Sequence, residues 1–233
     1  MHIPDGFLDP KMSTGLIGAA VAFLGLCLAK IRSMVTEIMP EKAYAATCKQ
    51  ISNFKKNTKR ILTKAGEQKI LQMSLVAGFI FAAQMFNFPI EAGTSGHLIG
   101  GVLAAVLLGP FAGAVVIGAV LIIQSLFFAD GGFFALGANI INMALIGSFL
   151  SYYLYVLLSK KFSQEVSIGI AAWASVMLAA LACSMEVGLS GIIGLGTVTF
   201  AMLKVHALIG IIEAFVTIIL VKYFKKIILG EKE

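Results

Sequence analysis

The chain is dominated by long apolar runs that are separated by short polar or glycine-rich breaks. A helix needs about 20 apolar residues to cross the hydrocarbon core of a bilayer. On this criterion the sequence predicts seven spans, at roughly 12–33, 69–87, 97–108, 110–128, 135–158, 165–187 and 199–224. The pattern therefore predicts an all-α polytopic membrane protein, in which residues 1–233 form a single transmembrane domain.

The third run is too short to cross a bilayer alone, and the pair Gly109-Pro110 separates it from the fourth. If that break is only a kink within one helix, the count falls from seven spans to six. A short span in contact with polar loops is tolerated only where protein or a cavity surrounds it. Residues 97–108 would therefore need other helices or a cavity around them.

Composition agrees with a membrane location. Of the 233 residues, 59% are hydrophobic and 13% are charged, and the mean hydropathy of +0.94 lies outside the range of soluble domains. No basic segment precedes an apolar run, and no small-residue cleavage site follows one. We therefore expect no signal peptide and an amino terminus that stays on the mature chain. Cys27, Cys48 and Cys183 share no CxxC spacing and predict neither a disulfide nor a zinc site.

Lysine and arginine residues decide between six and seven spans. Ten of them lie between the first and second runs or at the facing ends of these runs, two follow the fifth run, and four lie at or after the end of the seventh. Loops rich in these residues stay in the cytoplasm under the positive-inside rule. Seven spans place all three groups on one side, whereas six would put the first group opposite the other two. We therefore predict a cytoplasmic carboxyl terminus and an external amino terminus.

This orientation gathers acidic residues and histidines on the outer face. The outer segments, at 1–11, 88–96, 129–134 and 188–198, carry or border His2, Asp5, Glu91, His97, Asp130 and Glu186. A mildly anionic mouth of this kind attracts divalent cations.

The first seven residues, MHIPDGF, carry the strongest chemical signal. The α-amine of Met1, the backbone nitrogen of residue 2 and the imidazole of His2 can close adjacent chelate rings on one metal ion. A planar set of nitrogens that includes a deprotonated amide suits Ni²⁺ and Cu²⁺, or Co²⁺, better than tetrahedral Zn²⁺. Pro4 fixes φ and Asp5-Gly6 supplies a turn, so the segment is stiff and folds back. The alternative is that His2 lies on a frayed terminus.

His97 is the second candidate ligand. It follows the stretch GTSG at 93–96 and begins the third run, so from the outer mouth it can meet His2. A histidine at the start of a helix is otherwise a packed or capping-region residue, but the presence of His2 on the same face favours a metal ligand. The third run also carries a small-residue face that allows close backbone approach by an inserted terminal segment; it consists of Gly96, Gly100, Gly101, Ala104 and Ala105.

Several polar residues are candidates for supporting these ligands by hydrogen bonds to the histidine rings and the terminal segment. They are Asp5, Ser95, Asp130, Asn139 and Asn142. The alternative for those near the fifth run is a loop turn with helix–helix hydrogen bonds. His206 and Glu213 share one face of the last run; a functional pair and interhelical packing explain them equally well, and we do not assign them as ligands.

Residues 34–68 form the one sizeable polar region. Apolar residues recur there at roughly helical spacing among lysines, which predicts a basic amphipathic helix on the inner membrane surface. A solvated loop is the alternative. Neither an internal repeat nor a second domain is evident.

The sequence resembles the CbiM/NikM family, the substrate-binding S components of energy-coupling factor transporters for cobalt and nickel. The resemblance lies in three stretches: MHIPDGFL at 1–8, residues 81–110, which include GTSGH at 93–97, and FADGGFFALGANIINM at 128–143. It implies a seven-helix fold in the cell membrane of a prokaryote. It also implies a metal site made of the Met1 amine, the residue 2 amide nitrogen, the His2 imidazole and His97. One departure is the long basic segment at 34–68, which affects the inner face and leaves the site intact.

The resemblance implies that Co²⁺ or Ni²⁺ is the transported substrate. It further implies a membrane-embedded T component, two cytoplasmic ATPases and a small accessory membrane subunit as partners, and no nucleic acid. The chain has no GxxxxGK[ST] phosphate loop, so energy would come from a partner and the chain is not expected to be an enzyme. The alternatives are a stand-alone channel or carrier, and an intramembrane metalloenzyme, which the absence of HExxH makes weak.

Overall fold

The structure is a computed structural model that describes residues 2–38, 60–86, 88–90 and 94–228. These ranges are mostly helical, which confirms the predicted all-α character. The helices are α1 (Pro10–Val35), α3 (Lys64–Gln84), α4 (Gly101–Leu108), α5 (Pro110–Phe127), α6 (Leu136–Ile140), the π-helix η1 (Ile141–Leu150), α7 (Ser151–Leu158), α8 (Gln164–Leu189) and α9 (Leu195–Ile228).

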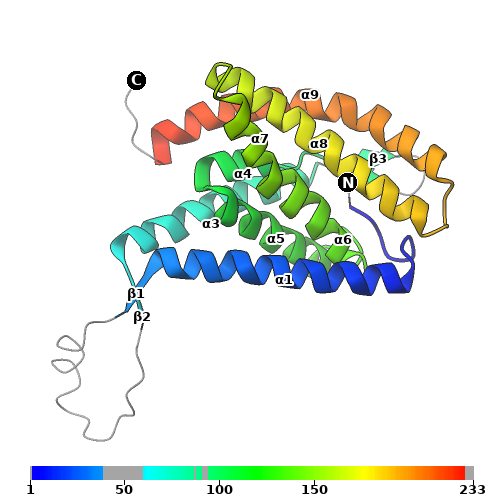
Figure 1. Ribbon diagram of the computed structural model, residues 1–233, viewed down its shortest axis with the longest axis horizontal. Coiled ribbons are helices and arrows are strands. Elements are labelled where there is room, and N and C mark those ends of the chain that lie inside the picture. The colour runs from blue at the N-terminus through cyan, green and yellow to red at the C-terminus, as the bar shows by residue number, and fades with distance from the viewer. Residues whose placement is uncertain (1, 39–59, 87, 91–93, 229–233) are drawn as a thin grey trace, which may run out of the picture.

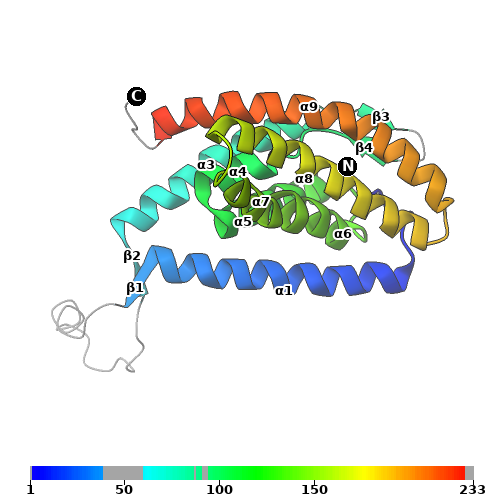
Figure 2. The ribbon, with the colours of Figure 1, turned by 45° about the horizontal axis from the view of Figure 1, so that its top comes forward.

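The helices form a bundle with α1 along one side and α8 and α9 along the other, as Figures 1 and 2 show. Helix α8 packs along α9, while α5 contacts α1, α4 and η1 in the middle. The core is a layer of aliphatic side chains such as Leu103, Ile117 and Val176, each at most 2% exposed. Most residues of α4 and α6 and half of those of α5 are buried in this bundle, whereas in α7 only Ser151 is buried.

Side-chain caps fix where the longer helices begin. An Asp9 carboxylate oxygen accepts a hydrogen bond from the backbone N–H of Lys11 at 2.9 Å, and Pro10 takes the first position of α1. Thr63 caps α3 in the same way through the N–H of Gly66. Because these signals are local, the helix starts lie close to where the apolar runs predict them.

Each predicted span overlaps a helix, and the fifth corresponds to α6, η1 and α7 in succession. Five helical segments in the described ranges are long and apolar enough to cross a membrane; they are Pro10–Val35, Pro110–Phe127, Leu136–Leu158, Gln164–Leu189 and Leu195–Lys226. Helix α4 has only 8 residues and does not qualify, and neither does α3. The chain is a multi-pass membrane protein, while the seven-span count and the sides of the two termini stay predictions.

Helix α4 is enclosed by protein, as its shortness requires. Val102, Ala104 and Ala105 are 0% exposed, and the helix contacts α5, η1, α8 and α9. A Cβ atom on Gly101 would overlap the backbone carbonyl of Gly147 in η1, so only glycine permits this approach.

Within the segment 34–68, the structure has strands and not the predicted amphipathic helix at residues 36–38 and 60–62. Strand β1 (Thr36–Ile38) pairs antiparallel with β2 (Arg60–Leu62), with Thr36 opposite Leu62. This pairing satisfies backbone groups where α1 ends and α3 is about to begin, and helical spacing of side chains cannot foresee it. Residues 39–59 lie outside the described ranges.

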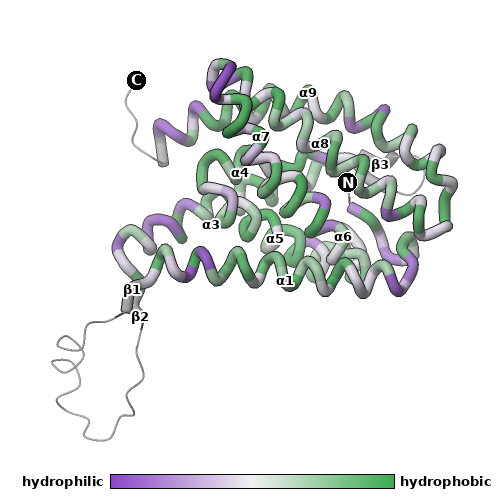
Figure 3. Tube along the Cα trace, in the orientation of Figure 1, coloured by the Kyte–Doolittle hydropathy of each residue, from purple (hydrophilic) through white to green (hydrophobic). Residues whose placement is uncertain are grey.

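Many large apolar side chains are exposed on the bundle, and Figure 3 shows that hydrophobic residues predominate along its helices. On α1, Val21 and Leu26 are 68% and 71% exposed, and on α9 Phe200 and Phe215 are 70% and 66% exposed. Apolar surface of this extent is typical of a protein whose surroundings are lipid.

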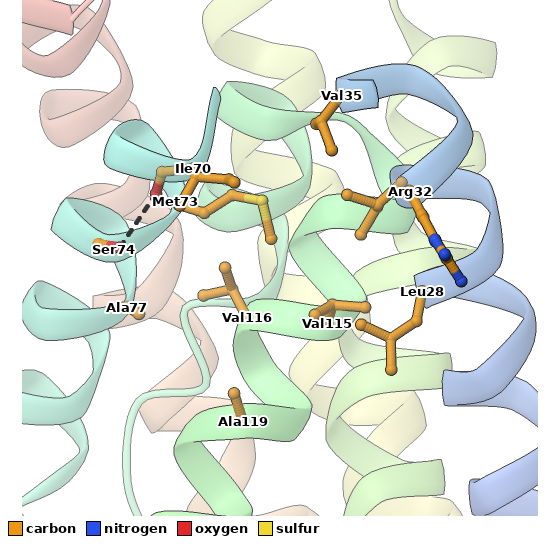
Figure 4. A pocket seen from close by; sticks show the side chains of 11 residues that line it. Leu28, Arg32, Val35, Ile70, Met73, Ser74, Ala77, Val115, Val116 and Ala119 are labelled. Carbon is orange, nitrogen blue, oxygen red and sulfur yellow. Dashed lines mark hydrogen bonds between the residues drawn. The ribbon is translucent and has the colours of Figure 1, made fainter. Parts of the chain in front are cut away.

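A pocket of about 360 Å³ lies between α1, α3 and α5 (Figure 4). Its lining includes Leu28, Met73 and Val116, and Arg32 is its one charged residue. It has no histidine, cysteine or carboxylate among its lining residues, so it lacks the ligands of a transition-metal site.

Candidate metal-binding site

The amino-terminal segment folds back from the start of α1 into the bundle, as the blue trace in Figure 1 shows. Ile3 is 0% exposed, and Asn139 of α6 pairs with both of its backbone groups: Asn139 Oδ1 accepts from Ile3 N at 2.8 Å, and Asn139 Nδ2 donates to Ile3 O at 3.2 Å. The N–H of Gly132 donates to the same carbonyl at 2.9 Å. The segment is therefore held in place and is not frayed from residue 2 onward; Met1 lies outside the described residues.

Asp5 anchors the turn in this segment. Its carboxylate accepts from the backbone N–H groups of Phe133, Phe134 and Ala135 at 3.0, 2.7 and 3.3 Å, just before α6. The Asp5 side chain thus ties the terminal segment to the loop before α6. It supports the segment, as predicted, through backbone groups and not through a histidine ring. Gly6 follows with φ of +89°, the left-handed conformation that the turn needs.

The loop at 131–132 approaches the segment closely. A Cβ on Gly132 would overlap the backbone of Asp5. Gly131 has φ of +89°, and a Cβ there would lie 3.4 Å from the His2 side chain. Glycine is required at both positions for the loop and the terminal segment to pack backbone to backbone.

His2 lies buried beside Asp130. Its ring is 3% exposed, and Nδ1 is 2.8 Å from Asp130 Oδ1. A carboxylate only accepts, so Nδ1 carries the proton and Nε2 keeps its lone pair. Burial lowers the pKa of His2, although the hydrogen bond with Asp130 acts in the opposite direction. The ring is thereby kept in the neutral form that binds metals.

His97 meets His2. The two ring centroids are 4.4 Å apart with the planes inclined by 44°. His97 Nδ1 donates to Leu98 O at 2.7 Å, so its Nε2 also keeps a lone pair. In the described part of the chain neither Nε2 atom has a hydrogen-bond partner. Two buried imidazoles therefore lie together with unused lone pairs, although they are 95 positions apart in the sequence.

His97 is more deeply buried than a position at an open mouth would be, at 1% exposed. The reason is that His2 packs against its ring while β4 (Thr94–Gly96), paired with β3 (Phe88–Ile90), adjoins α9.

The other residues predicted to support the histidines do not hydrogen-bond to them in the described part of the chain. Asn142 Nδ2 donates to Glu186 Oε2 at 2.6 Å, so it joins η1 to α8 and makes no hydrogen bond to either histidine ring. The side chains of Ser95 and Glu91 lie outside what the structure describes.

The third histidine, His206, lies within α9, where its Nδ1 donates to Met202 O at 2.8 Å. Within the described ranges no group of three or more His, Cys, Asp or Glu side chains could hold a metal ion, so an ion bound by His2 and His97 would need donors of another kind.

Two further residues lie near the site: the sequence singles out Glu213 without assigning it a role, and it does not single out Gln84. Glu213 accepts from Ile99 N and Gly100 N, and Gln84 Nε2 donates to Ile99 O. Both fix the backbone just after His97. A glutamine and a glutamate inside apolar runs are signals of a buried contact, but their partners are backbone groups, which no side-chain pattern reveals.

Comparison with known proteins places these features in a family. A family model described as the cobalt uptake substrate-specific transmembrane region, CbiM, matches residues 43–228. A putative fused nickel transport protein NikMN of Archaeoglobus fulgidus is 37% identical over 225 residues, which cover 96% of this chain and 65% of that protein. A cobalt transport protein CbiM of Thermosediminibacter oceani is 35% identical over 133 residues, covering 57% of this chain and 54% of that protein.

A crystal structure of a truncated transition metal transporter has the same fold. Its TM-score is 0.77 at 31% sequence identity, and the match covers 97% of this chain and 99% of that one. Because the family model matches most of the chain, the protein belongs to the CbiM/NikM family of cobalt and nickel transport proteins.

Proposed function

We propose that the chain is the substrate-binding subunit of an importer that captures Co²⁺ or Ni²⁺ outside the cell. The observation that carries this is the pair of buried rings, His2 and His97, with centroids 4.4 Å apart and both Nε2 atoms lacking a hydrogen-bond partner in the described residues. The two rings come from segments far apart in the sequence, and imidazole is a ligand that both ions accept. The relatives named for nickel and cobalt transport support the choice of ion.

The ligands we assign are the Met1 amine, the residue 2 amide nitrogen, the His2 imidazole and His97 Nε2. Chelation with the residue 2 nitrogen uses His2 Nδ1, because only that atom closes a six-membered ring with the amide and the metal. The contact between Nδ1 and Asp130 at 2.8 Å competes with this. A half-turn of the ring about Cβ–Cγ frees Nδ1 and brings Nε2 to the Asp130 side, where its N–H can donate to the carboxylate as metal-bound histidines usually do.

Charge also favours the assignment. One deprotonated amide offsets part of the 2+ charge, and the Asp130 carboxylate beside His2 adds a negative charge at the site. A buried cation is tolerated only when paired in this way. Four nitrogen donors with one anionic amide suit Ni²⁺ or Co²⁺, and they leave no open position for a reacting water, which argues against a metalloenzyme.

Transport then needs partners. We propose that a T component, two cytoplasmic ATPases and a small accessory membrane subunit complete the importer, as the family resemblance implies. Uptake should stop when the ATPases are inactivated; uptake that continues would favour a stand-alone channel or carrier. The direct test is titration of purified protein with Co²⁺ and Ni²⁺ by calorimetry and mass spectrometry. Binding of neither ion would refute the proposal.

The proposed topology predicts a labelling pattern. In a variant without the natural cysteines, Ile90→Cys should react with an impermeant thiol reagent in intact cells, whereas Asn57→Cys should react only after permeabilisation. The reason is that most lysines and arginines lie on the side of residue 57, which the positive-inside rule assigns to the cytoplasm. The reverse pattern would show that the orientation is inverted.

A further inference from the structure

The short segment between His97 and α4 is held from two other helices. Glu213 of α9 accepts two hydrogen bonds from it: Oε2 from the N–H of Ile99 at 2.9 Å, and Oε1 from the N–H of Gly100 at 2.7 Å. Gln84 at the end of α3 donates to the carbonyl of Ile99 at 2.7 Å. Both side chains are buried, with Glu213 2% and Gln84 0% exposed. Two successive peptide groups are thus fixed just after the candidate ligand.

One of these peptides also orients the His97 ring. His97 Nδ1 donates at 2.7 Å to the carbonyl of Leu98. That carbonyl and the N–H of Ile99 belong to the same planar peptide unit, whose N–H donates to Glu213. A continuous path of hydrogen bonds therefore runs from the Glu213 carboxylate through one rigid peptide to His97, with Nε2 at its far end.

We propose that Glu213 is a positioning residue for metal binding: through the Leu98–Ile99 peptide it fixes the orientation of His97 and strengthens Nε2 as a donor. This inference rests on the proposed function. A carboxylate that accepts the N–H polarises the peptide, which makes its carbonyl a better acceptor for His97 Nδ1–H. A histidine that donates its other N–H to a good acceptor is a more basic metal ligand with a fixed ring.

The surroundings prevent the segment from adjusting if this path is lost. Gly100 has φ of +70°, and a Cβ there would lie 2.9 Å from the Ile80 side chain, so the chain turns in a tightly filled space. Ile99 itself is 0% exposed. The ring of His97 consequently depends on where α9 places Glu213, although that residue is 116 positions away and touches neither histidine by a hydrogen bond in the described residues.

A purely structural role is the competing explanation. Gly100 provides no side-chain cap for α4, and a carboxylate at a helix start stabilises that helix by itself. If Glu213 only caps α4, its loss should lower stability without changing how a folded protein holds the ion. A measurement on the bound ion separates the two roles.

The test is Glu213→Gln, with Thr217→Val as a matched control. Glutamine keeps the size of the side chain but turns one N–H acceptor into an N–H donor. Thr217 lies one turn further along α9 and is equally buried, at 2% exposed. We expect folded Glu213→Gln to bind Ni²⁺ or Co²⁺ about 10- to 100-fold more weakly, as is typical when a group that orients a metal ligand is changed. We also expect a shift in the visible absorption band of the bound ion, and parent-like values for Thr217→Val.

Parent affinity and an unshifted band in folded Glu213→Gln would overturn the inference. If that variant does not fold, Glu213→Asp decides, because it keeps a carboxylate but withdraws it by one methylene group from the N–H groups of Ile99 and Gly100. A fall in its affinity at parent stability supports the inference, and no fall overturns it. The parent is titrated alongside: a parent that binds neither ion refutes the proposed function itself, whereas a binding parent with equally binding variants refutes only the role of Glu213.

Discussion

Inserting two leucines between Met1 and His2 is expected to abolish tight binding of Co²⁺ and Ni²⁺. The insertion separates the α-amine from the histidine, so that the amide nitrogen of the histidine loses the adjacent amine whose chelation favours its deprotonation. If four donors share an affinity of about 10–16 kcal/mol, each carries about 3 kcal/mol, and losing two costs on the order of 10⁴-fold. Calorimetry on the folded protein measures this directly.

The choice of two bulky residues matters. A single alanine would place the histidine third, where the amine, two amides and the imidazole form a four-nitrogen chelate of their own. It would also allow removal of the initiator methionine, since the aminopeptidase prefers a small second residue, and this would restore an amine next to the histidine. The control carries the same two leucines after Glu233. Unchanged affinity in the folded, extended protein would show that the amine takes no part.

The helical bundle could be predicted from the sequence because its cause is local. An apolar run of sufficient length gives a helix, and caps such as Asp9 and Thr63 mark where helices begin. The π-helix η1 and the β1–β2 pair were not foreseen. The β1–β2 pair joins segments distant in the sequence, and Gly101 of α4 closely approaches Gly147 within η1; such contacts leave no periodic signal.

For the candidate site, too, one part could be predicted from the sequence and another could not. His2 and His97 could be brought together from the sequence because the distribution of lysines placed both at one face. The hydrogen-bond partners of Asp5, Glu213 and Gln84 could not be predicted from the sequence, because each side chain binds backbone N–H or C=O groups of another segment. Backbone groups are the same in every residue, so only the fold identifies which of them a buried polar side chain satisfies.

Replacing His97 is the second decisive change. His97→Ala removes one of four proposed donors and should weaken binding by about 3 kcal/mol, or on the order of 100-fold, compared with about 1 kcal/mol for an ordinary hydrogen bond. The chain offers a matched control in His206→Ala. Both histidines are at most 1% exposed, both donate from Nδ1 to a backbone carbonyl, and both have an Nε2 without a partner in the described residues.

Only His97 lies against His2, with ring centroids 4.4 Å apart. The two substitutions should therefore create similar cavities and cost similar stability, which thermal unfolding can compare, while calorimetry with Ni²⁺ and Co²⁺ should separate them. We expect His206→Ala to bind within a few-fold of the parent. Parent-like binding by His97→Ala would make that histidine structural. An equal loss in both variants would mean that the cavity, and not a missing donor, disturbs the site, because only one of the two rings is in place to share an ion with the amino-terminal segment.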